Sequence, residues 1–230
     1  MSLPDGEDPH VGTTELDLGL TVALLSDERY TALAERLRRA GFAPDRNNNG
    51  NPTRQRWKVS TDLGQVTVDF LIPPSREGDK GGAIRHIDSD FAAYIIPGLD
   101  LAFADRESVT LSGETIMGEK ATRQVWVCGP AAFVVLKALA FGSRGENKDA
   151  YDLYYVLRNY GGGVEAVAER MRQHLAHPQA EKALAILRAD FTDPDSLGPR
   201  RAAEFLTGGA DEDIQVDVVG YVEELLRQLD

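Results

Sequence analysis

The spacing of apolar residues changes once along this chain of 230 residues, near Cys128. Before that point apolar and polar residues alternate over short runs such as "ELDLGLTV", which is typical of half-buried strands. After it they recur at helical spacing, and the first such run, "PAAFVVLKALAF", predicts a helix that has Pro130 in its first turn and ends at Gly142. The sequence therefore predicts an α/β half, residues 1–128, followed by a helical half, residues 129–230.

The strands of the first half place three carboxylates on polar faces. In "ELDLGLTV", Glu15 and Asp17 share one face. A helix is predicted next, over "SDERYTALAERLRRAGF". Two strands, "RQRWKVST" and "QVTVDFLIP", follow and are joined by "DLG", a hairpin signal. Residues 75–90 look like a mobile surface loop, and residues 108–127 lean towards β-structure. In the second hairpin strand Val66, Val68, Phe70 and Ile72 form the apolar face, which leaves Asp69 on the other.

Carboxylates arranged in this way suit a hard divalent cation. Mg²⁺ prefers one or two carboxylates together with phosphate oxygens and water. If the two strands are neighbours, Glu15, Asp17 and Asp69 could hold a metal pair for a phosphoryl displacement. The alternative, which spacing alone leaves open, is that these acids form the solvated face of ordinary strands.

The first two helices of the second half carry a group of charges. Lys137 is the only charge between Pro130 and Phe141, which is costly unless it reaches solvent or meets an anion such as a triphosphate. Two structural interpretations stay open beside this one. Lys148 and Asp152 have the spacing of an ion pair within one helix, and Asp149 lies where a helix N-terminus favours negative charge.

Composition limits the possible partners. A formal net charge of −12 argues against broad attachment to nucleic acid or to an anionic membrane. Residues 36–58 nevertheless hold seven cations and one acid, which fits either a basic face for a phosphate-bearing ligand or solvated arginines. No apolar run approaches the roughly 18 residues of a membrane span, and the N-terminus lacks the features of a signal peptide. We expect a cytoplasmic protein without a membrane partner, and the single cysteine, Cys128, is interpreted as a core thiol.

Three segments taken in order resemble a known family. These are "GTTELDLGL", "VTVDFL" and "PAAFVVLKALAFGSRGENKDAYDLYYVL". They are similar to the bacterial AbiEii/AbiGii-type nucleotidyltransferases of abortive-infection and toxin–antitoxin systems, over roughly residues 10–160. The resemblance implies a nucleotidyltransferase-like, polymerase beta-type mixed sheet with helices. It also implies Mg²⁺- or Mn²⁺-dependent transfer of a nucleoside monophosphate from an NTP to an acceptor, which some members find on tRNA, and a cognate antitoxin protein.

The resemblance also assigns roles to individual residues. It implies that the metal is held by Glu15, Asp17 and Asp69. It implies that the catalytic residues are these three acids together with Lys137, Asp149 and Asp152. It implies that the nucleotide is bound by Thr13, Thr14, Lys137, Arg144 and Lys148.

One element of the family pattern is not found in the segment "MSLPDGEDPHVG". The family has a Gly-Gly or Gly-Ser turn roughly a dozen residues before the acid pair, where backbone N–H groups hold the nucleotide phosphates. Two expectations follow: either the chain as given starts too late, or the protein has lost this element. Two other functions therefore stay open, a non-catalytic nucleotidyltransferase-like module that binds a partner protein, and a metal-dependent phosphohydrolase.

Overall fold

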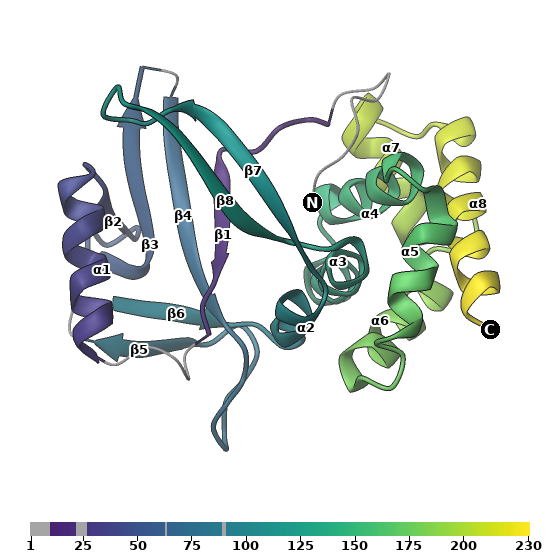
Figure 1. Cartoon of the computed structure of the whole chain (residues 1–230). Helices are drawn as coiled ribbons and strands as arrows, with labels where there is room; N and C mark the ends of the chain where they lie inside the picture. The colour runs from purple at the N-terminus through teal and green to yellow at the C-terminus, as the bar shows by residue number, and fades with distance from the viewer. Residues whose placement is uncertain (1–9, 22–26, 63, 89–90) are drawn as a thin grey trace. The chain divides into compact units, whose positions relative to one another are not determined.

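The computed structural model describes residues 10–21, 27–62, 64–88 and 91–230. They divide into two compact units (Figure 1). The sheet unit comprises Val11–Asp100 and Thr110–Val125. The helical unit comprises Met1–His10, Leu101–Val109 and Trp126–Asp230, and His10 is the described residue of its first segment. The division of the chain into domains at residues 128 and 129 stays a prediction.

The sheet unit is built on a mixed sheet with the strand order β2-β3-β4-β6-β5, and β1 pairs in parallel with β4. The hairpin of β3 and β4 is antiparallel, as its turn signal predicts, whereas β4 and β6 run parallel. The bounds are β1 Glu15–Gly19, α1 Asp27–Arg39, β2 Ala43–Arg46, β3 Pro52–Thr61, β4 Gly64–Ile72, β5 Ile84–Asp88 and β6 Phe91–Ile95.

One face of this sheet carries the core of the unit. The predicted apolar side of β4 is buried, with Phe70 exposed by 1% and Ile72 by 0%, and it packs with Trp57 of β3. Helix α1 contributes Ala34 to the same cluster. Because apolar residues of β4 alternate with polar ones, burying one face leaves the other for polar side chains.

The prediction of a loop over residues 75–90 is wrong for residues 84–88, and residues 89–90 lie outside the described part of the chain. Ile84–Asp88 forms β5, which pairs antiparallel with β6. This strand lacks a clear apolar alternation, since Ile84 is exposed and Arg85 is buried. The buried Arg85 instead donates hydrogen bonds to Asp79 and Ser75, so polar pairing supports a strand that apolar spacing does not reveal.

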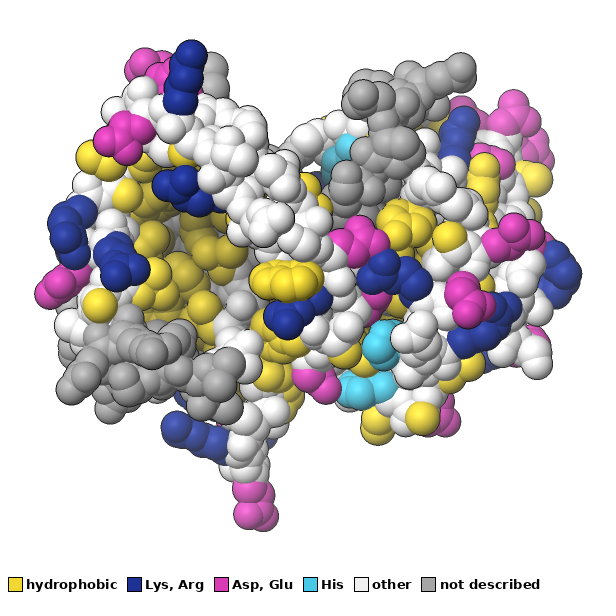
Figure 2. Space-filling view, viewed as in Figure 1, with side chains coloured by type: hydrophobic (Ala, Val, Ile, Leu, Met, Phe, Trp, Pro, Cys, Tyr) yellow, Lys and Arg dark blue, Asp and Glu magenta, His cyan; other side chains and the backbone are white. Residues whose placement is uncertain are grey.

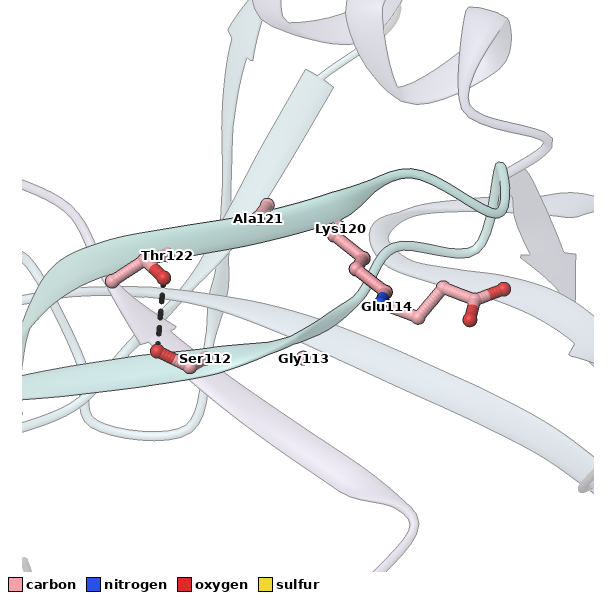
Figure 3. A pocket seen from close by; sticks show the side chains of 6 residues that line it. All are labelled: Ser112, Gly113, Glu114, Lys120, Ala121 and Thr122. Carbon is pink, nitrogen blue, oxygen red and sulfur yellow. Dashed lines mark hydrogen bonds between the residues drawn. The ribbon is translucent and has the colours of Figure 1, made fainter.

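The β-leaning residues 108–127 form most of a second, two-stranded sheet, of β7 (Arg106–Glu114) and β8 (Lys120–Cys128). Ser112 and Thr122 hydrogen-bond across it through their side-chain oxygens, 2.9 Å apart (Figure 3). These two residues line a pocket together with Gly113, Glu114, Lys120 and Ala121. A short helix, α2 (Leu99–Ala104), which the sequence does not predict, precedes this sheet.

The predicted helical half is confirmed. Its helices are α3 Pro130–Arg144, α4 Asn147–Asn159, α5 Gly163–Arg172, α6 Pro178–Asp190, α7 Leu197–Thr207 and α8 Glu212–Leu229. They enclose one apolar cluster that includes Phe141, Leu153 and Phe191. Acidic and basic side chains lie beside one another on the surface of this unit (Figure 2). In the part of the chain that the structure describes, no helix is both long and apolar enough to span a membrane.

Helix α3 does not end at Gly142, contrary to the sequence prediction. It continues to Arg144 and ends at Gly145, which has a φ of 64° and donates its N–H to the Phe141 carbonyl at 2.7 Å. Only glycine takes this left-handed conformation without a steric cost. Gly142 lies inside the helix, where a Cβ would meet Ile186 Cδ1 at 2.5 Å. The first glycine therefore permits close packing of α3 on α6, and the second ends the helix.

Candidate functional site

Strand pairing brings the three predicted carboxylates to one side of the sheet unit. Asp17 of β1 and Asp69 of β4 are direct Cα partners in the parallel pair. Glu15 lies two residues before Asp17 and therefore points to the same side. On the other edge of β4, Asp69 has Arg56 of β3 as its Cα partner. We call these four residues the acid face.

Arg56 makes close contacts with two acids of the acid face. Its Nε and Nη2 donate to Oδ1 and Oδ2 of Asp69 at 2.7 and 2.6 Å, a bidentate pair. Its Nη2 also lies 3.5 Å from Glu15 Oε1. The hydrogen bond to Asp69 and the charges of Asp69 and Glu15 raise the pKa of Arg56 above its ordinary value, although burial opposes this. A permanent positive charge thus lies among the predicted metal ligands.

Three threonines lie at or beside the acid face. The hydroxyl of Thr13 accepts the Glu15 N–H at 3.1 Å, and Thr14 accepts the Thr67 N–H through its carbonyl at 3.0 Å. Both Thr13 and Thr14 are exposed. Thr67, the Cα partner of Glu15, has a buried hydroxyl oxygen for which the described part of the structure provides no hydrogen-bond partner. That hydroxyl retains a free hydrogen-bonding capacity on the side of the sheet that carries the acids.

The acid face has suitable donors for a metal, but they are not gathered around one point. All three acids provide hard carboxylate oxygens, the ligands that Mg²⁺ prefers. Within the described ranges, no three His, Cys, Asp or Glu side chains lie close enough together to hold a metal ion. In the bidentate pair, both oxygens of Asp69 are directed at the guanidinium of Arg56 on β3.

The helical unit gathers the other predicted residues around two buried carboxylates. Asp149, exposed by 1%, accepts hydrogen bonds from Nε and Nη2 of Arg144 at 2.6 and 2.8 Å. Lys137 Nζ of α3 lies 3.4 Å from Asp149 Oδ1 and 2.6 Å from Oδ2 of Asp152. Lys148 Nζ also binds Asp152, at 2.9 and 3.0 Å. These five residues are the charged cluster.

Asp152 also contacts His10, whose Nε2 lies 3.0 Å from its Oδ1. The imidazole packs against the rings of Tyr151 and Tyr155. Burial favours the protonated acid, but the charges and hydrogen bonds of Lys137 and Lys148 outweigh it and hold the pKa of Asp152 below its ordinary value. Asp152 is therefore ionised at neutral pH.

The two structural interpretations of these charges that the sequence left open are both confirmed. The i,i+4 pair of Lys148 with Asp152 forms, and Asp149 lies in the first turn of α4. The cluster still has one more cation than acids. Because Arg144 and Lys148 are 58% and 40% exposed, their donors can also reach an anion in solution. The arrangement therefore supports the helix packing and leaves positive charge for phosphate.

The predicted site residues thus form two groups, one in each unit. Sequence reasoning missed two of their partners, Arg56 and His10. Arg56 alternates with buried Trp57 and so could be placed on the polar side of its strand. His10 contacts a residue 142 positions away, and no local signal in the sequence indicates that contact.

The chain combines a mixed sheet, which carries acids on paired strands, with a unit made of helices. This combination defines a nucleotidyltransferase-like α+β fold. A family model described as "Nucleotidyl transferase AbiEii toxin, Type IV TA system" matches residues 16–230. The chain therefore belongs to the AbiEii family of nucleotidyltransferase toxins. This match continues past residue 160, where the resemblance of the quoted motifs ends, and so includes α5 to α8. Comparisons with curated proteins and with solved structures give no significant match.

Membership in this family identifies the class of system in which the protein acts. The members are toxins of type IV toxin–antitoxin systems, and such a system pairs the toxin with an antitoxin.

Proposed function

We propose that this protein transfers a nucleoside monophosphate from an NTP to a hydroxyl of an RNA acceptor, with tRNA as the first acceptor to test. The observation that carries the proposal is the register of β1 and β4, which makes Asp17 and Asp69 direct partners. Family membership supplies the reaction class.

In the proposed reaction the acceptor oxygen attacks the α-phosphorus of the NTP. A new P–O bond forms, the bond from this phosphorus to the pyrophosphate oxygen breaks, and pyrophosphate leaves. The proton of the acceptor hydroxyl passes to the Asp69 carboxylate or to water. Asp69 is assigned this role because it lies on the polar side of the sheet as the direct Cα partner of Asp17.

Glu15, Asp17 and Asp69 would hold Mg²⁺ or Mn²⁺. Their donor type and common side fit a cation that completes its coordination with phosphate oxygens and water. When bound, the metal would neutralise charge that develops on the phosphate oxygens. Thr13 and Thr14, exposed at the start of β1, would contribute hydroxyl groups to the nucleotide.

Taken by itself, the charged cluster of the helical unit would bind a phosphate-bearing ligand. Lys137, Arg144 and Lys148 provide the cationic donors. Asp149 and Asp152 would orient them, since each buried carboxylate holds two of these cations by ion pairs.

The test is to incubate the protein with each α-labelled NTP, Mg²⁺ and total RNA. We expect label to enter RNA, and Asp17→Ala to lower this transfer by about 100-fold or more, the scale seen when a stabiliser of developing charge is removed. The control is Asp62→Asn, which removes an exposed acid at the turn of the β3–β4 hairpin and should leave the rate unchanged.

The same experiments distinguish this proposal from a phosphohydrolase and from a non-catalytic module. Transfer that survives Asp17→Ala contradicts the proposed role of the acid face. Phosphate release without an acceptor indicates a phosphohydrolase. No NTP binding by calorimetry with Mg²⁺ present, together with stable co-purification of a partner protein, indicates a non-catalytic module.

A further inference from the structure

We propose that Arg56 is a positioning residue that holds Asp69 and Glu15 in the metal-free protein and releases them when a divalent cation binds. This inference rests on the proposed function, because it takes the acids of the acid face as metal ligands. It adds a residue that the family resemblance does not assign.

The contacts of Arg56 place its charge where a metal would compete with it. Both oxygens of Asp69 accept hydrogen bonds from Arg56, and the same guanidinium lies 3.5 Å from Glu15. A divalent cation bound to these two carboxylates would lie within a few ångström of that guanidinium. Like charges at such a distance repel strongly even near a protein surface. The cation and the close guanidinium contacts therefore exclude each other.

Arg56 is able to move. Its side chain is 33% exposed, so it can swing towards solvent without opening the core. Its neighbour Trp57 points to the opposite side of β3 and is fully buried, which anchors the strand while the guanidinium changes position. The released guanidinium would then be free to pair with an NTP phosphate, whose geometry matches its fork of donors.

A different role for Arg56 predicts the opposite result. Carboxylates that bind metals are often oriented by a hydrogen-bond donor that stays in place. Such a residue strengthens metal binding, and its removal weakens it. The structure favours release, because Arg56 contacts two of the three predicted ligands and is itself no metal ligand while it occupies both oxygens of Asp69.

The experiment measures Mn²⁺ affinity by electron paramagnetic resonance without nucleotide, so that it does not depend on turnover. We expect Arg56→Gln to bind Mn²⁺ about fivefold more tightly than the unchanged protein, because one repelling charge is gone. The matched control is Arg54→Gln, which removes the same charge from an exposed position two residues earlier on β3 and should change the affinity less than about twofold. Arg56→Lys should give an intermediate affinity, because an ammonium cannot form the bidentate pair.

An unchanged or weaker affinity of Arg56→Gln would overturn the inference. If that variant does not fold, as judged by circular dichroism, Arg56→Lys decides, and an affinity equal to or below that of the unchanged protein overturns the inference. Asp17→Ala separates this inference from the proposed function. If Asp17→Ala binds Mn²⁺ as tightly as the unchanged protein, the proposed metal site itself is wrong. If Asp17→Ala loses binding while the Arg56 variants match the unchanged protein, only the role of Arg56 is wrong.

Discussion

Asp152 is 2% exposed and yet has a pKa below the ordinary value of an aspartate. A buried charge is tolerated only when partners compensate for its lost hydration, and here Lys137, Lys148 and His10 do so. The ionised form of Asp152 is therefore stable only because these neighbours contact it. Removing the charge leaves the lysines facing an amide.

We predict that Asp152→Asn lowers the free energy of unfolding by about 2 kcal/mol at pH 7. Because the folded state lowers the pKa of Asp152, this contribution is fully present above the unfolded value near 3.8 and is lost as pH falls through the lower folded value. The difference between the two proteins should therefore shrink between about pH 5 and pH 3. Urea unfolding at several pH values measures it.

The control for this prediction is Glu204→Gln, which removes one partner of an exposed i,i+3 pair with Arg201. Exposed pairs contribute little, so the change should stay within about 0.5 kcal/mol at each pH. A deficit of Asp152→Asn that is the same at pH 3 and pH 7 would contradict the argument.

The placement of individual site residues could be predicted only where local rules decide it. Period-two alternation places Glu15, Asp17 and Asp69 on polar sides of their strands. The turn between Thr61 and Gly64 sets the hairpin register, and counting back from it brings Arg56 opposite Asp69. The sequence therefore contained the register that pairs Arg56 with Asp69. The interpretations of the basic residues 36–58 were a phosphate-bearing ligand or solvated arginines, and neither included a carboxylate partner for Arg56.

At the scale of elements, a helical glycine without a positive φ can lie either against a close neighbour or on an open surface. A Cβ at Gly198, near the start of α7, would overlap the ring of Phe191, which is fully buried. Gly220, in the middle of α8, is exposed, and a Cβ there would meet nothing within 4 Å. The same substitution should therefore have opposite effects in these two helices.

We predict that Gly198→Ala lowers the free energy of unfolding by about 2 kcal/mol, because the ring has no free space to move into. Gly220→Ala should raise it by about 0.5 kcal/mol, since alanine costs less backbone entropy in a helix. Guanidinium unfolding of both variants, followed by circular dichroism at 222 nm, gives the two midpoints. A stabilising Gly198→Ala would show that α7 can shift away from Phe191.

Two elements that the sequence does not predict, α7 and β5, lack the regular apolar spacing by which a helix or strand is recognised. In α7, Gly198 and Pro199 lie in the first turn and interrupt the helical pattern, although a proline there costs no helical hydrogen bond. In β5, backbone pairing with β6 and the polar contacts of Arg85 replace apolar alternation. Side-chain spacing, together with a turn signal, was enough to predict the hairpin of β3 and β4. Helical spacing was enough to predict the long helix α8.

At the scale of the whole molecule, the described residues form two apolar cores, one under the mixed sheet and one among the helices. Its fold class could be predicted because the periodicity changes once, near Cys128. The exact composition of the two units could not, because Leu101–Val109 belongs to the helical unit although it precedes that change. Such membership depends on contacts between distant parts of the chain.

We predict that two cores produce two unfolding transitions in scanning calorimetry. Phe70→Ala, in the sheet core, should lower one midpoint, and Leu153→Ala, in the helical core, the other, each at a cost of about 3 kcal/mol to its own unit. Each variant serves as the control for the other. A single transition that moves by the same amount in both variants would mean that the two cores unfold as one.

The pairing of β1 with β4 also has a consequence for synthesis on the ribosome. Parallel strands need a long connection between them. The last pair of this ladder, Gly19 with Leu71, can form only after Leu71 has been translated. At roughly 5–20 residues per second, this interval lasts several seconds. A nascent chain that ends within it carries Glu15 and Asp17 but cannot yet bring them beside Asp69, so the proposed metal site exists only after translation has passed the end of β4.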